Sequence, residues 1–207
     1  MTRIKCCGVT RVEDALLAAR LGADAIGLVF AARSPRAVSI QRAAEIVRAL
    51  PPFVASVALF MDDDALRVQQ VLDEVRPALL QFHGSETDAW CTQFGRPFLK
   101  AIAMGEGASA VARLQLWPHA AALLLDGHAQ GEAGGAGHTF DWSVLPTGLR
   151  QPLILAGGLD ALNVGAGIRA LRPWAVDVAT GVEMAPGIKS VDKLAAFIRA
   201  VRAEDAA

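Results

Sequence analysis

The sequence of 207 residues has few cysteines and almost no excess charge, and these shortages exclude several classes of protein. Its three cysteines, Cys6, Cys7 and Cys91, are odd in number and two of them are adjacent. This is a poor basis for a disulfide framework and suits a reducing compartment. Twenty basic residues oppose 21 acidic ones, so the net charge of −1 gives no electrostatic signature of nucleic-acid or anionic-membrane binding.

Several short motifs are missing as well. No CxxC or HxxxH spacing occurs, so we expect no metal site. No apolar run is long enough to cross a bilayer, and the N-terminus lacks the basic-then-apolar pattern of a signal peptide. We therefore expect a cytoplasmic protein that binds neither nucleic acid nor membrane.

What the sequence does have is a regular alternation of strand and helix patterns. Its hydrophobic content of 53% is ample for a core, and the expected strand at 24–30 is nearly all apolar, as a parallel strand buried on both faces is. The expected strands span residues 3–7, 24–30, 53–60, 78–82, 98–102, 121–126, 152–156 and 174–178. The expected helices span residues 12–21, 39–50, 62–75, 85 onward, 108–116, 140 onward, 160–171 and 190–201.

Strict alternation of this kind predicts a parallel sheet. Eight strand–helix units of about 26 residues each lie near the lower size limit of a (β/α)8 barrel, or TIM barrel. An open doubly wound sheet is the alternative, but the turn after the first strand lacks the GxGxxG dinucleotide fingerprint, and eight evenly spaced units fit closure better. We therefore predict an α/β fold, a single-domain (β/α)8 barrel over residues 1–207.

Local signals predict where three helices begin. Thr10 and Glu13 have the spacing of a capping box, in which the threonine accepts from the helix and the glutamate reaches back. Ser39 and Asp62 are the expected N-caps of the next two helices. Residues 127–139 form the longest irregular stretch, and a loop of that length is usually functional or disordered.

On a barrel the carboxyl ends of all the strands share one face, where active sites lie. The residues that would reach this face are Cys7, Arg36, Gln81, His83, Asp126, Gly157, Gly158, Asp177, Thr180 and Gly181. The glycines follow the seventh and eighth strands, where this fold usually binds phosphate, because glycine lets backbone N–H groups approach an anion. The alternative is that these glycines only make tight turns.

Cys7 and Asp126 end the first and sixth strands and are candidates for acid–base chemistry. Alternation puts Cys6 in the core if Cys7 points into the barrel mouth. A free thiol is only about 3% thiolate at pH 7, so Cys7 would need nearby positive charge or N–H dipoles to act as a base. Otherwise it is an ordinary buried cysteine. Asp126 is costly to bury unpaired, which suits a general acid, although it could instead cap the following loop.

Three further polar residues have two interpretations each. Asp177 lies inside an apolar strand and is expected to bind a ligand or to be structural. His83 is either a hydrogen-bonded loop residue or a catalyst. Arg36 lies in a basic loop, and its planar guanidinium suits a carboxylate, although it could instead be a solvated surface arginine.

Seven motifs, in order and with barrel spacing, resemble those of the phosphoribosylanthranilate isomerases, enzymes of the tryptophan pathway. They are KCCG at 5–8, SPR at 34–36 with VS at 38–39, QFHG at 81–84, LD at 125–126, GGAG at 134–137 before FDW at 140–142, LAGGL at 155–159 and DVATGVE at 177–183. Each motif alone is weak, but seven in sequence along the whole chain form a specific pattern.

The resemblance implies an aldose–ketose isomerase that converts N-(5-phosphoribosyl)anthranilate to the carboxyphenylamino deoxyribulose phosphate. This Amadori rearrangement needs no cofactor and no metal. By position, Cys7 would be the general base and Asp126 the general acid, and Arg36 would hold the anthranilate carboxylate. The other substrate-binding residues would be Gln81, His83 and Asp177, and the phosphate-binding residues would be Gly157, Gly158, Thr180 and Gly181. We expect a monomer.

Other sugar-phosphate barrels are the alternatives. The related ribonucleotide isomerase of histidine synthesis would be expected to have an aspartate where Cys7 stands. The next enzyme of the tryptophan pathway would need catalytic lysines, and this chain offers only Lys100 on a mid-barrel strand. A phosphosugar-binding barrel without turnover would keep the glycine loops but would not need both Cys7 and Asp126.

Overall fold

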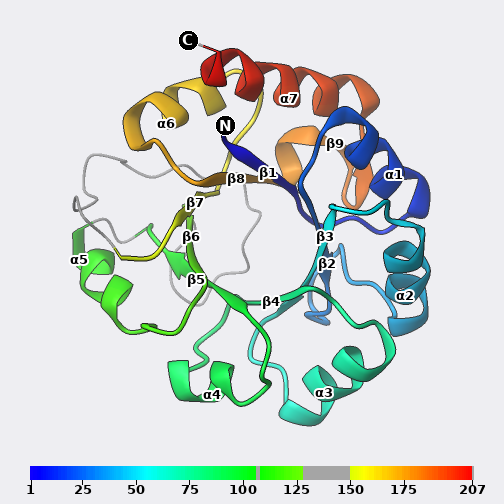
Figure 1. The fold of residues 1–207 in the computed structure, drawn as a ribbon, viewed down its shortest axis with the longest axis vertical. Coiled ribbons are helices and arrows are strands. Elements are labelled where there is room, and N and C mark those ends of the chain that lie inside the picture. The colour runs from blue at the N-terminus through cyan, green and yellow to red at the C-terminus, as the bar shows by residue number, and fades with distance from the viewer. Residues whose placement is uncertain (106–107, 128–149, 207) are drawn as a thin grey trace.

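Eight parallel strands close into a barrel in the order in which they occur along the chain (Figure 1). The computed structural model describes residues 1–105, 108–127 and 150–206. The first strand pairs with both the second and the eighth, which closes the sheet and confirms the predicted barrel over the open alternative. The strands are β1 Arg3–Cys6, β2 Ala25–Val29, β3 Ala55–Phe60, β4 Leu79–Phe82, β5 Phe98–Ala103, β6 Ala122–Asp126, β7 Leu153–Leu155 and β8 Ala175–Val178.

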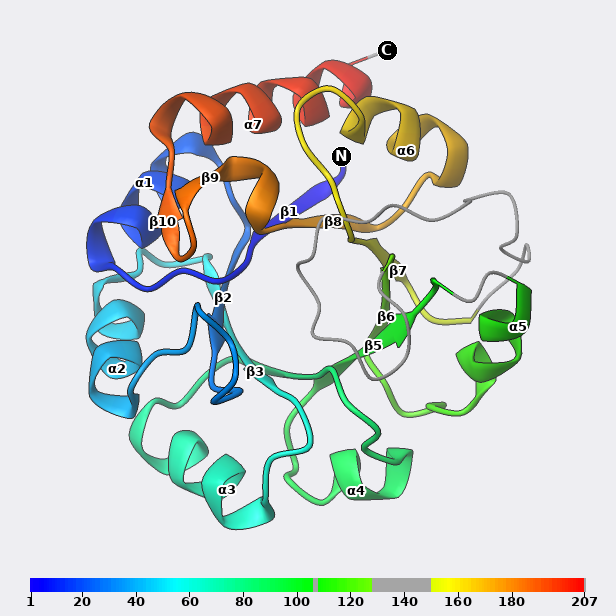
Figure 2. The same cartoon turned by 180° about the vertical axis from the view of Figure 1, so that it is seen from behind.

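Helices surround the barrel, as both faces of the ribbon drawing show (Figures 1 and 2). They are α1 Val12–Leu21, α2 Ile40–Ala49, α3 Ala65–Glu74, α4 Asp88–Thr92, α5 Ala108–Val111, α6 Val164–Leu171 and α7 Val191–Asp205. A short antiparallel hairpin, β9 Glu183–Ala185 and β10 Ile188–Lys189, lies between β8 and α7 and was not predicted. Its strands are too short to give a sequence pattern of their own.

The hydrophobic core has two layers because strand side chains alternate between the two faces of the sheet. Outward-facing residues of the strands pack with residues of the helices. Examples are Ile26, Phe60, Leu80, Val68 and Phe197. The barrel interior is a separate cluster made of strand side chains. It includes Val57, Leu99, Leu124 and Ile154.

Two predicted helix caps are wrong, and in both cases contacts with distant loops explain the difference. Helix α1 begins after Arg11 without a side-chain cap, and the Thr10 hydroxyl instead donates to the carbonyl of Gly187, at 2.7 Å. The N-cap of α3 is Asp64, whose side chain accepts from Arg67 N, whereas Asp62 accepts from the backbone and hydroxyl of Ser85.

The Ser39 cap is confirmed, and other boundaries shift. The Ser39 hydroxyl accepts from Arg42 N at 3.1 Å. Helix α6 begins four residues later than predicted, because Asp160 and Asn163 bond to each other's backbone and form a turn before it. The predicted loop at 127–139 lies almost wholly outside the described residues, as does the helix start at 140.

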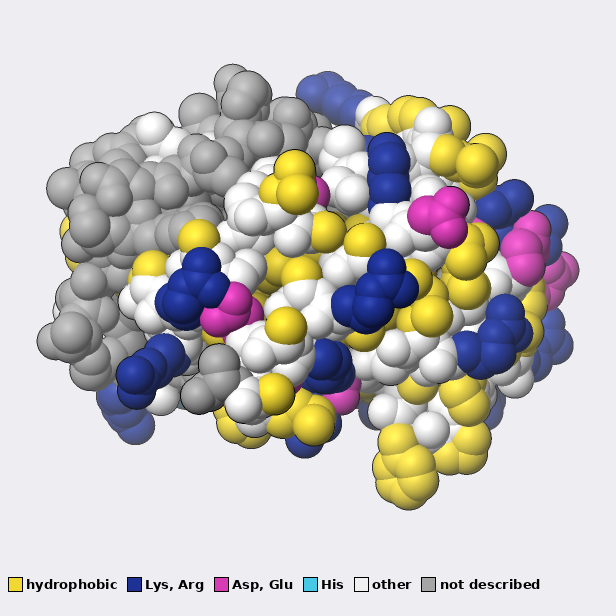
Figure 3. Space-filling model, turned by 90° about the horizontal axis from the view of Figure 1, so that it is seen from above, with side chains coloured by type: hydrophobic (Ala, Val, Ile, Leu, Met, Phe, Trp, Pro, Cys, Tyr) yellow, Lys and Arg dark blue, Asp and Glu magenta, His cyan; other side chains and the backbone are white. Residues whose placement is uncertain are grey.

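The surface mixes charged and hydrophobic side chains. The view from above shows Lys and Arg, Asp and Glu, and hydrophobic side chains interspersed over that face (Figure 3). Within the described residues, no helix combines the length and apolar character that crossing a membrane requires.

Candidate functional site

A cavity of about 260 Å³ lies at the carboxyl end of the barrel strands. All ten residues that the sequence analysis placed on this face line it. They are Cys7, Arg36, Gln81, His83, Asp126, Gly157, Gly158, Asp177, Thr180 and Gly181. They meet because the carboxyl ends of parallel strands come together at one rim of the barrel.

Cys7 follows β1 at the edge of the cavity. Its backbone N–H donates to the carbonyl of Val178 on β8, at 2.8 Å, which continues the pairing of the two strands. Its side chain is 6% exposed and packs with Val29 and Leu59 around the barrel mouth. Cys6 is fully buried in the outer layer, as predicted.

Two buried lysines lie close to Cys7, and neither was predicted from the sequence to take part in the site. Lys5 lies two residues earlier on the same face of β1, and its Nζ is 2.9 Å from Asp177 Oδ2. Lys189 Nζ donates to the carbonyl of Cys7 at 2.5 Å. Burial raises the pKa of the Cys7 thiol above its ordinary value, while the positive charge of Lys5 and, to a lesser degree, Lys189 acts to lower it. The cations that a thiolate needs are therefore present, and removing either would raise the thiol pKa further.

Asp126 ends β6 and lies beside His83. The His83 Nε2 is 3.6 Å from Asp126 Oδ2, and the Gln81 Nε2 is 3.4 Å from His83 Nδ1. If the Gln81 amide donates to Nδ1, a neutral His83 carries its proton on Nε2, facing Asp126. This arrangement places a polarisable hydrogen-bonding group next to the candidate acid.

Two buried oxygen atoms of the cavity have no hydrogen-bond partner among the described residues. They are Asp177 Oδ1 and Gln81 Oε1. Buried acceptors without a donor are costly, so such atoms in a cavity suit the hydroxyl groups of a bound ligand. Burial raises the pKa of Asp177, and the charge of Lys5 opposes that shift.

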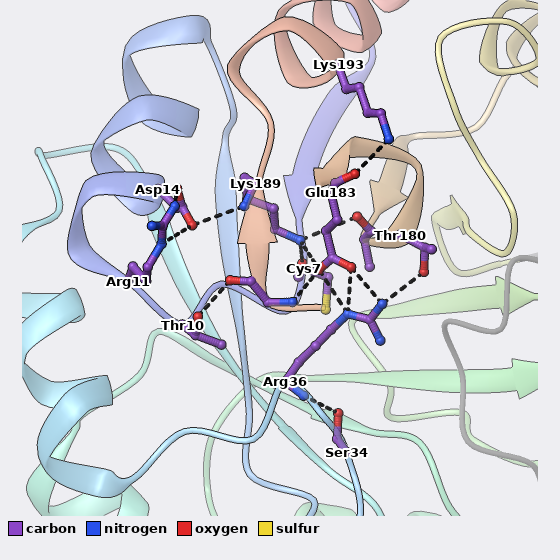
Figure 4. A network of polar contacts seen from close by, with 12 residues as sticks. Cys7, Thr10, Arg11, Asp14, Ser34, Arg36, Thr180, Glu183, Lys189 and Lys193 are labelled. Atoms are coloured by element: carbon purple, nitrogen blue, oxygen red, sulfur yellow. Dashed lines mark hydrogen bonds and ion pairs between the residues drawn. The ribbon is translucent and has the colours of Figure 1, made fainter. Parts of the chain in front are cut away.

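Arg36 is held by a carboxylate that sequence reasoning missed (Figure 4). Its Nε lies 2.9 Å from Glu183 Oε1, and its Nη2 lies 2.7 Å from Glu183 Oε2. The same Nη2 is 3.1 Å from the Thr180 hydroxyl. Glu183 ends the DVATGVE motif, and no local pattern shows that it reaches an arginine 147 residues away. Arg36 is 9% exposed, so it is not a solvated surface arginine.

The glycine loops after β7 and β8 touch each other at the cavity. A Cβ on Gly181 would lie 2.0 Å from the carbonyl oxygen of Leu159, so only glycine allows this approach. Gly157 and Gly158 have φ of 81° and 60°, in the left-handed region. Two backbone segments thus line the same part of the cavity with no side chain between them, which suits an anion.

The described residues contain no cluster of three or more His, Cys, Asp or Glu side chains that could hold a metal ion. The groups that the described residues supply to this cavity are a thiol flanked by cations, a carboxyl group beside a histidine, an arginine, and backbone at two loops.

The chain is similar to one protein family over almost its whole length. The family model described as N-(5'phosphoribosyl)anthranilate (PRA) isomerase matches residues 4–200. A relative from Pseudomonas paraeruginosa, named N-(5'-phosphoribosyl)anthranilate isomerase, is 55% identical over 200 residues, which cover 97% of this chain and 95% of the relative.

Solved structures agree with the sequence similarity. Phosphoribosyl anthranilate isomerase from Thermus thermophilus is 38% identical with a TM-score of 0.86, covering 98% of this chain and 99% of its own. A second structure, 32% identical with a TM-score of 0.80, covers 98% of this chain and 100% of its own. It is a phosphoribosyl anthranilate isomerase in complex with reduced 1-(o-carboxyphenylamino)-1-deoxyribulose 5-phosphate.

Proposed function

This chain belongs to the N-(5'-phosphoribosyl)anthranilate isomerase family, and we propose that its cavity performs the family's reaction with Asp126 as general acid and Cys7 as general base. The protein is an aldose–ketose isomerase of tryptophan biosynthesis. The observation that carries the proposed roles is that a single cavity brings the Asp126 carboxyl group and the Cys7 thiol together with Arg36 and the two glycine loops.

The first step opens the furanose ring. The bond between C1 and the ring oxygen breaks, the nitrogen lone pair forms a C1=N bond, and the ring oxygen takes a proton. In the proposal Asp126 gives that proton, and His83 beside it supports the carboxylate that remains. The product of this step is a protonated Schiff base.

The second step removes the proton from C2. The C2–H electrons form a C1=C2 bond, the C1=N electrons return to nitrogen, and the thiolate of Cys7 takes the proton. The resulting enolamine becomes the ketone when its hydroxyl proton leaves and C1 gains one. The sum is an isomerisation with no net gain or loss of protons or electrons, so one acid and one base suffice.

Lys5 makes the base step feasible in a buried site. A thiolate in an apolar environment is disfavoured, and a fixed cation on the same strand face offsets part of that cost. Burial alone would lower the pKa of Lys5, but the negative charge of Asp177 raises it above its ordinary value, so Lys5 stays charged. Lys5 is therefore proposed as a positioning residue that acts through Cys7.

The remaining residues of the cavity are proposed to hold the two ends and the middle of the substrate. Arg36 would bind the anthranilate carboxylate, and the free acceptors of Asp177 and Gln81 would take sugar hydroxyls. The phosphate-binding residues would be Gly157, Gly158, Thr180 and Gly181. A relative binds the reduced product, which has a carboxylate, hydroxyls and a phosphate.

We also propose that the protein works in the cytoplasm as a monomer whose 207 residues form one domain. The support is that the described part of one chain already supplies every residue assigned to the cavity. Light scattering after size-exclusion chromatography should give a mass near 21.7 kDa, and twice that mass would contradict the monomer.

The direct test of the reaction uses the purified protein and N-(5'-phosphoribosyl)anthranilate. Isomerisation should abolish the fluorescence of the substrate, and nuclear magnetic resonance should show a ketone carbon in the product. Asp126→Asn is the control for nonenzymatic decay. Equal decay with wild type and with Asp126→Asn would contradict the proposed acid, and no decay above the protein-free rate would contradict the proposed reaction.

A further inference from the structure

We propose that Glu183 is a positioning residue for Arg36, and that Arg36, Glu183 and Lys189 together form a preset cationic site for the substrate carboxylate. The inference rests on the proposed role of Arg36 and adds the group that orients it. Glu183 lines no part of the cavity itself and would act only through the arginine.

Glu183 lies at the centre of the network (Figure 4). Its carboxylate accepts from Arg36 Nε and Nη2, from Lys189 Nζ at 2.9 Å, and from the backbone N–H of Gly187 at 3.1 Å. Its side chain is 4% exposed and that of Lys189 is fully buried. Both oxygens of the carboxylate are thus occupied by donors, so its position is fixed from several sides.

The charges of this network do not cancel. Arg36 and Lys189 carry two positive charges, and Glu183 supplies one negative charge between them. Burial alone would raise the pKa of Glu183, but the bonds from Arg36 and the charge of Lys189 more than offset it and lower the pKa, so the carboxylate is ionised. One positive charge remains at the arginine, and a substrate carboxylate would neutralise it.

The bonds to Glu183 also determine which N–H donors of Arg36 remain available to a ligand. The Nε donor and one Nη2 donor bind the carboxylate, and Thr180 lies within reach of Nη2. Among the described residues, no acceptor bonds to Nη1. A guanidinium has five donors in a rigid plane, so fixing one edge by Glu183 fixes where the opposite edge points.

The aliphatic part of the Arg36 side chain packs against Gly8, which follows β1. A Cβ on Gly8 would lie 2.4 Å from Arg36 Cδ, so the arginine crosses the chain where there is no side chain. Lys189 donates to the Cys7 carbonyl next to this glycine and to Glu183. The carboxylate site is therefore built on the same strand end that holds the candidate base.

The test measures binding of two probes, the reduced product and inorganic phosphate. Glu183→Gln should weaken the affinity for the reduced product by roughly tenfold to a hundredfold. The affinity for inorganic phosphate should stay within about twofold of wild type, because only the reduced product has a carboxylate. In turnover, KM should rise more than kcat falls, since the contact holds the ground state and the transition state alike. The double variant Glu183→Gln with Lys189→Met keeps the net charge of the network and should give the same selective loss.

Glu86→Gln is the matched control. Glu86 and Lys100 form another buried pair, with Nζ to Oε2 at 2.9 Å and side chains 3% and 1% exposed, but neither residue lines the cavity. This variant should lower the melting temperature without changing the ratio of the two affinities. A purely structural role for Glu183 would make its variants behave in the same way.

The variants distinguish failure of the positioning role of Glu183 from failure of the carboxylate-binding role of Arg36. If Arg36→Met binds the reduced product as wild type does, the role of Arg36 itself is wrong. If Arg36→Met loses the selective affinity but both Glu183 variants keep it, only the positioning role is overturned. An equal loss for both probes, or a double variant that does not fold, would also overturn it by making Glu183 a general support of the barrel.

Discussion

Cys7 and Asp126 have different surroundings, and their proposed roles follow from them. The thiol lies near two cations, and the carboxyl group lies beside a histidine. Cys7→Ser and Asp126→Asn should each lower turnover by roughly 10² to 10⁴, because each removes one proton-transfer group. Steady-state kinetics would measure this, with the melting temperature as the control for folding. Turnover near that of wild type in either variant would remove that residue from the mechanism.

The influence of Lys5 on Cys7 can be measured without turnover. The alkylation rate of Cys7 by iodoacetamide should rise with pH as the thiolate forms, with a midpoint above that of an ordinary thiol. Lys5→Met should move the midpoint to higher pH, because it removes a nearby positive charge. Cys6 and Cys91 are fully buried, whereas Cys7 lines the cavity, so Cys7 should react first.

Lys100→Met is the control for that experiment. Lys100 is also a buried lysine paired with a carboxylate, but it bonds to Glu86 and to the carbonyls of Phe82 and Gly84. Its loss should leave the alkylation profile of Cys7 unchanged. An unchanged profile in Lys5→Met as well would mean that Lys5 does not tune the thiol.

At the residue scale, position along the strands predicted which residues reach the cavity, but not what surrounds them. Cys7 and Asp126 could be found because each lies at the carboxyl end of a predicted strand. Glu183 and Lys189 could not, because their partners Arg36 and Cys7 lie 147 and 182 residues earlier in the chain and come near only through the pairing of β8 with β1 and the hairpin after β8. Lys5 meets Asp177 through the register of β1 and β8, which no local pattern encodes.

At the element scale, the paired loops after β7 and β8 lead to a prediction about phosphate. A phosphosugar ligand that binds only the folded state should stabilise it by RT ln(1 + [L]/Kd), about 2.7 kcal/mol at a hundredfold excess over Kd. Gly157→Glu should abolish the rise in melting temperature that the reduced product gives, because it adds a side chain and a negative charge where the phosphate would lie.

Gly95→Glu is the matched control for backbone strain. Gly95 also has a left-handed φ, 59° against 81° for Gly157, but it lies in the loop after α4 with open space around it. Both variants should lower the melting temperature of the free protein, and only Gly157→Glu should lose the response to ligand. Equal responses would place the phosphate elsewhere.

The elements themselves were predicted best where they bury apolar side chains. All eight strands lie within the predicted ranges or extend one residue beyond them, because buried parallel strands are almost continuously apolar. Helix caps were less predictable. Thr10 and Asp62 have the chemistry of caps, yet each bonds to a distant loop, which is a tertiary contact that competes with capping.

At the scale of the whole molecule, the barrel order followed from the alternation of strands and helices, since eight such units leave few other architectures. The same alternation does not explain why a barrel interior contains charges. The Lys5–Asp177 pair and the Arg36–Glu183–Lys189 network are buried near the cavity at the carboxyl end of the strands. Buried ion pairs are weak contributors to stability, so we attribute them to function.

These buried carboxylates should make stability depend on pH in opposite directions. The pKa of Glu183 is lowered from its usual 4.5, so its contribution is present above about pH 4.5 and is lost as pH falls through the lower folded value. The pKa of Asp177 is raised from its usual 3.8, so ionisation of this group lowers the free energy of unfolding. That cost is removed as pH falls through the raised folded value toward 3.8. Each pKa unit corresponds to about 1.4 kcal/mol.

Melting temperatures measured from pH 7 down to pH 3 would test both signs. The advantage of wild type over Glu183→Gln should shrink below about pH 4.5, because a protonated glutamate resembles glutamine. The melting temperature of wild type should rise relative to that of Asp177→Asn as pH falls, because a protonated Asp177 no longer carries a buried charge. Parallel curves for wild type and Glu183→Gln would mean that Glu183 has the same pKa in the folded and the unfolded chain. Its buried bonds to Arg36 and Lys189 would then not lower that pKa.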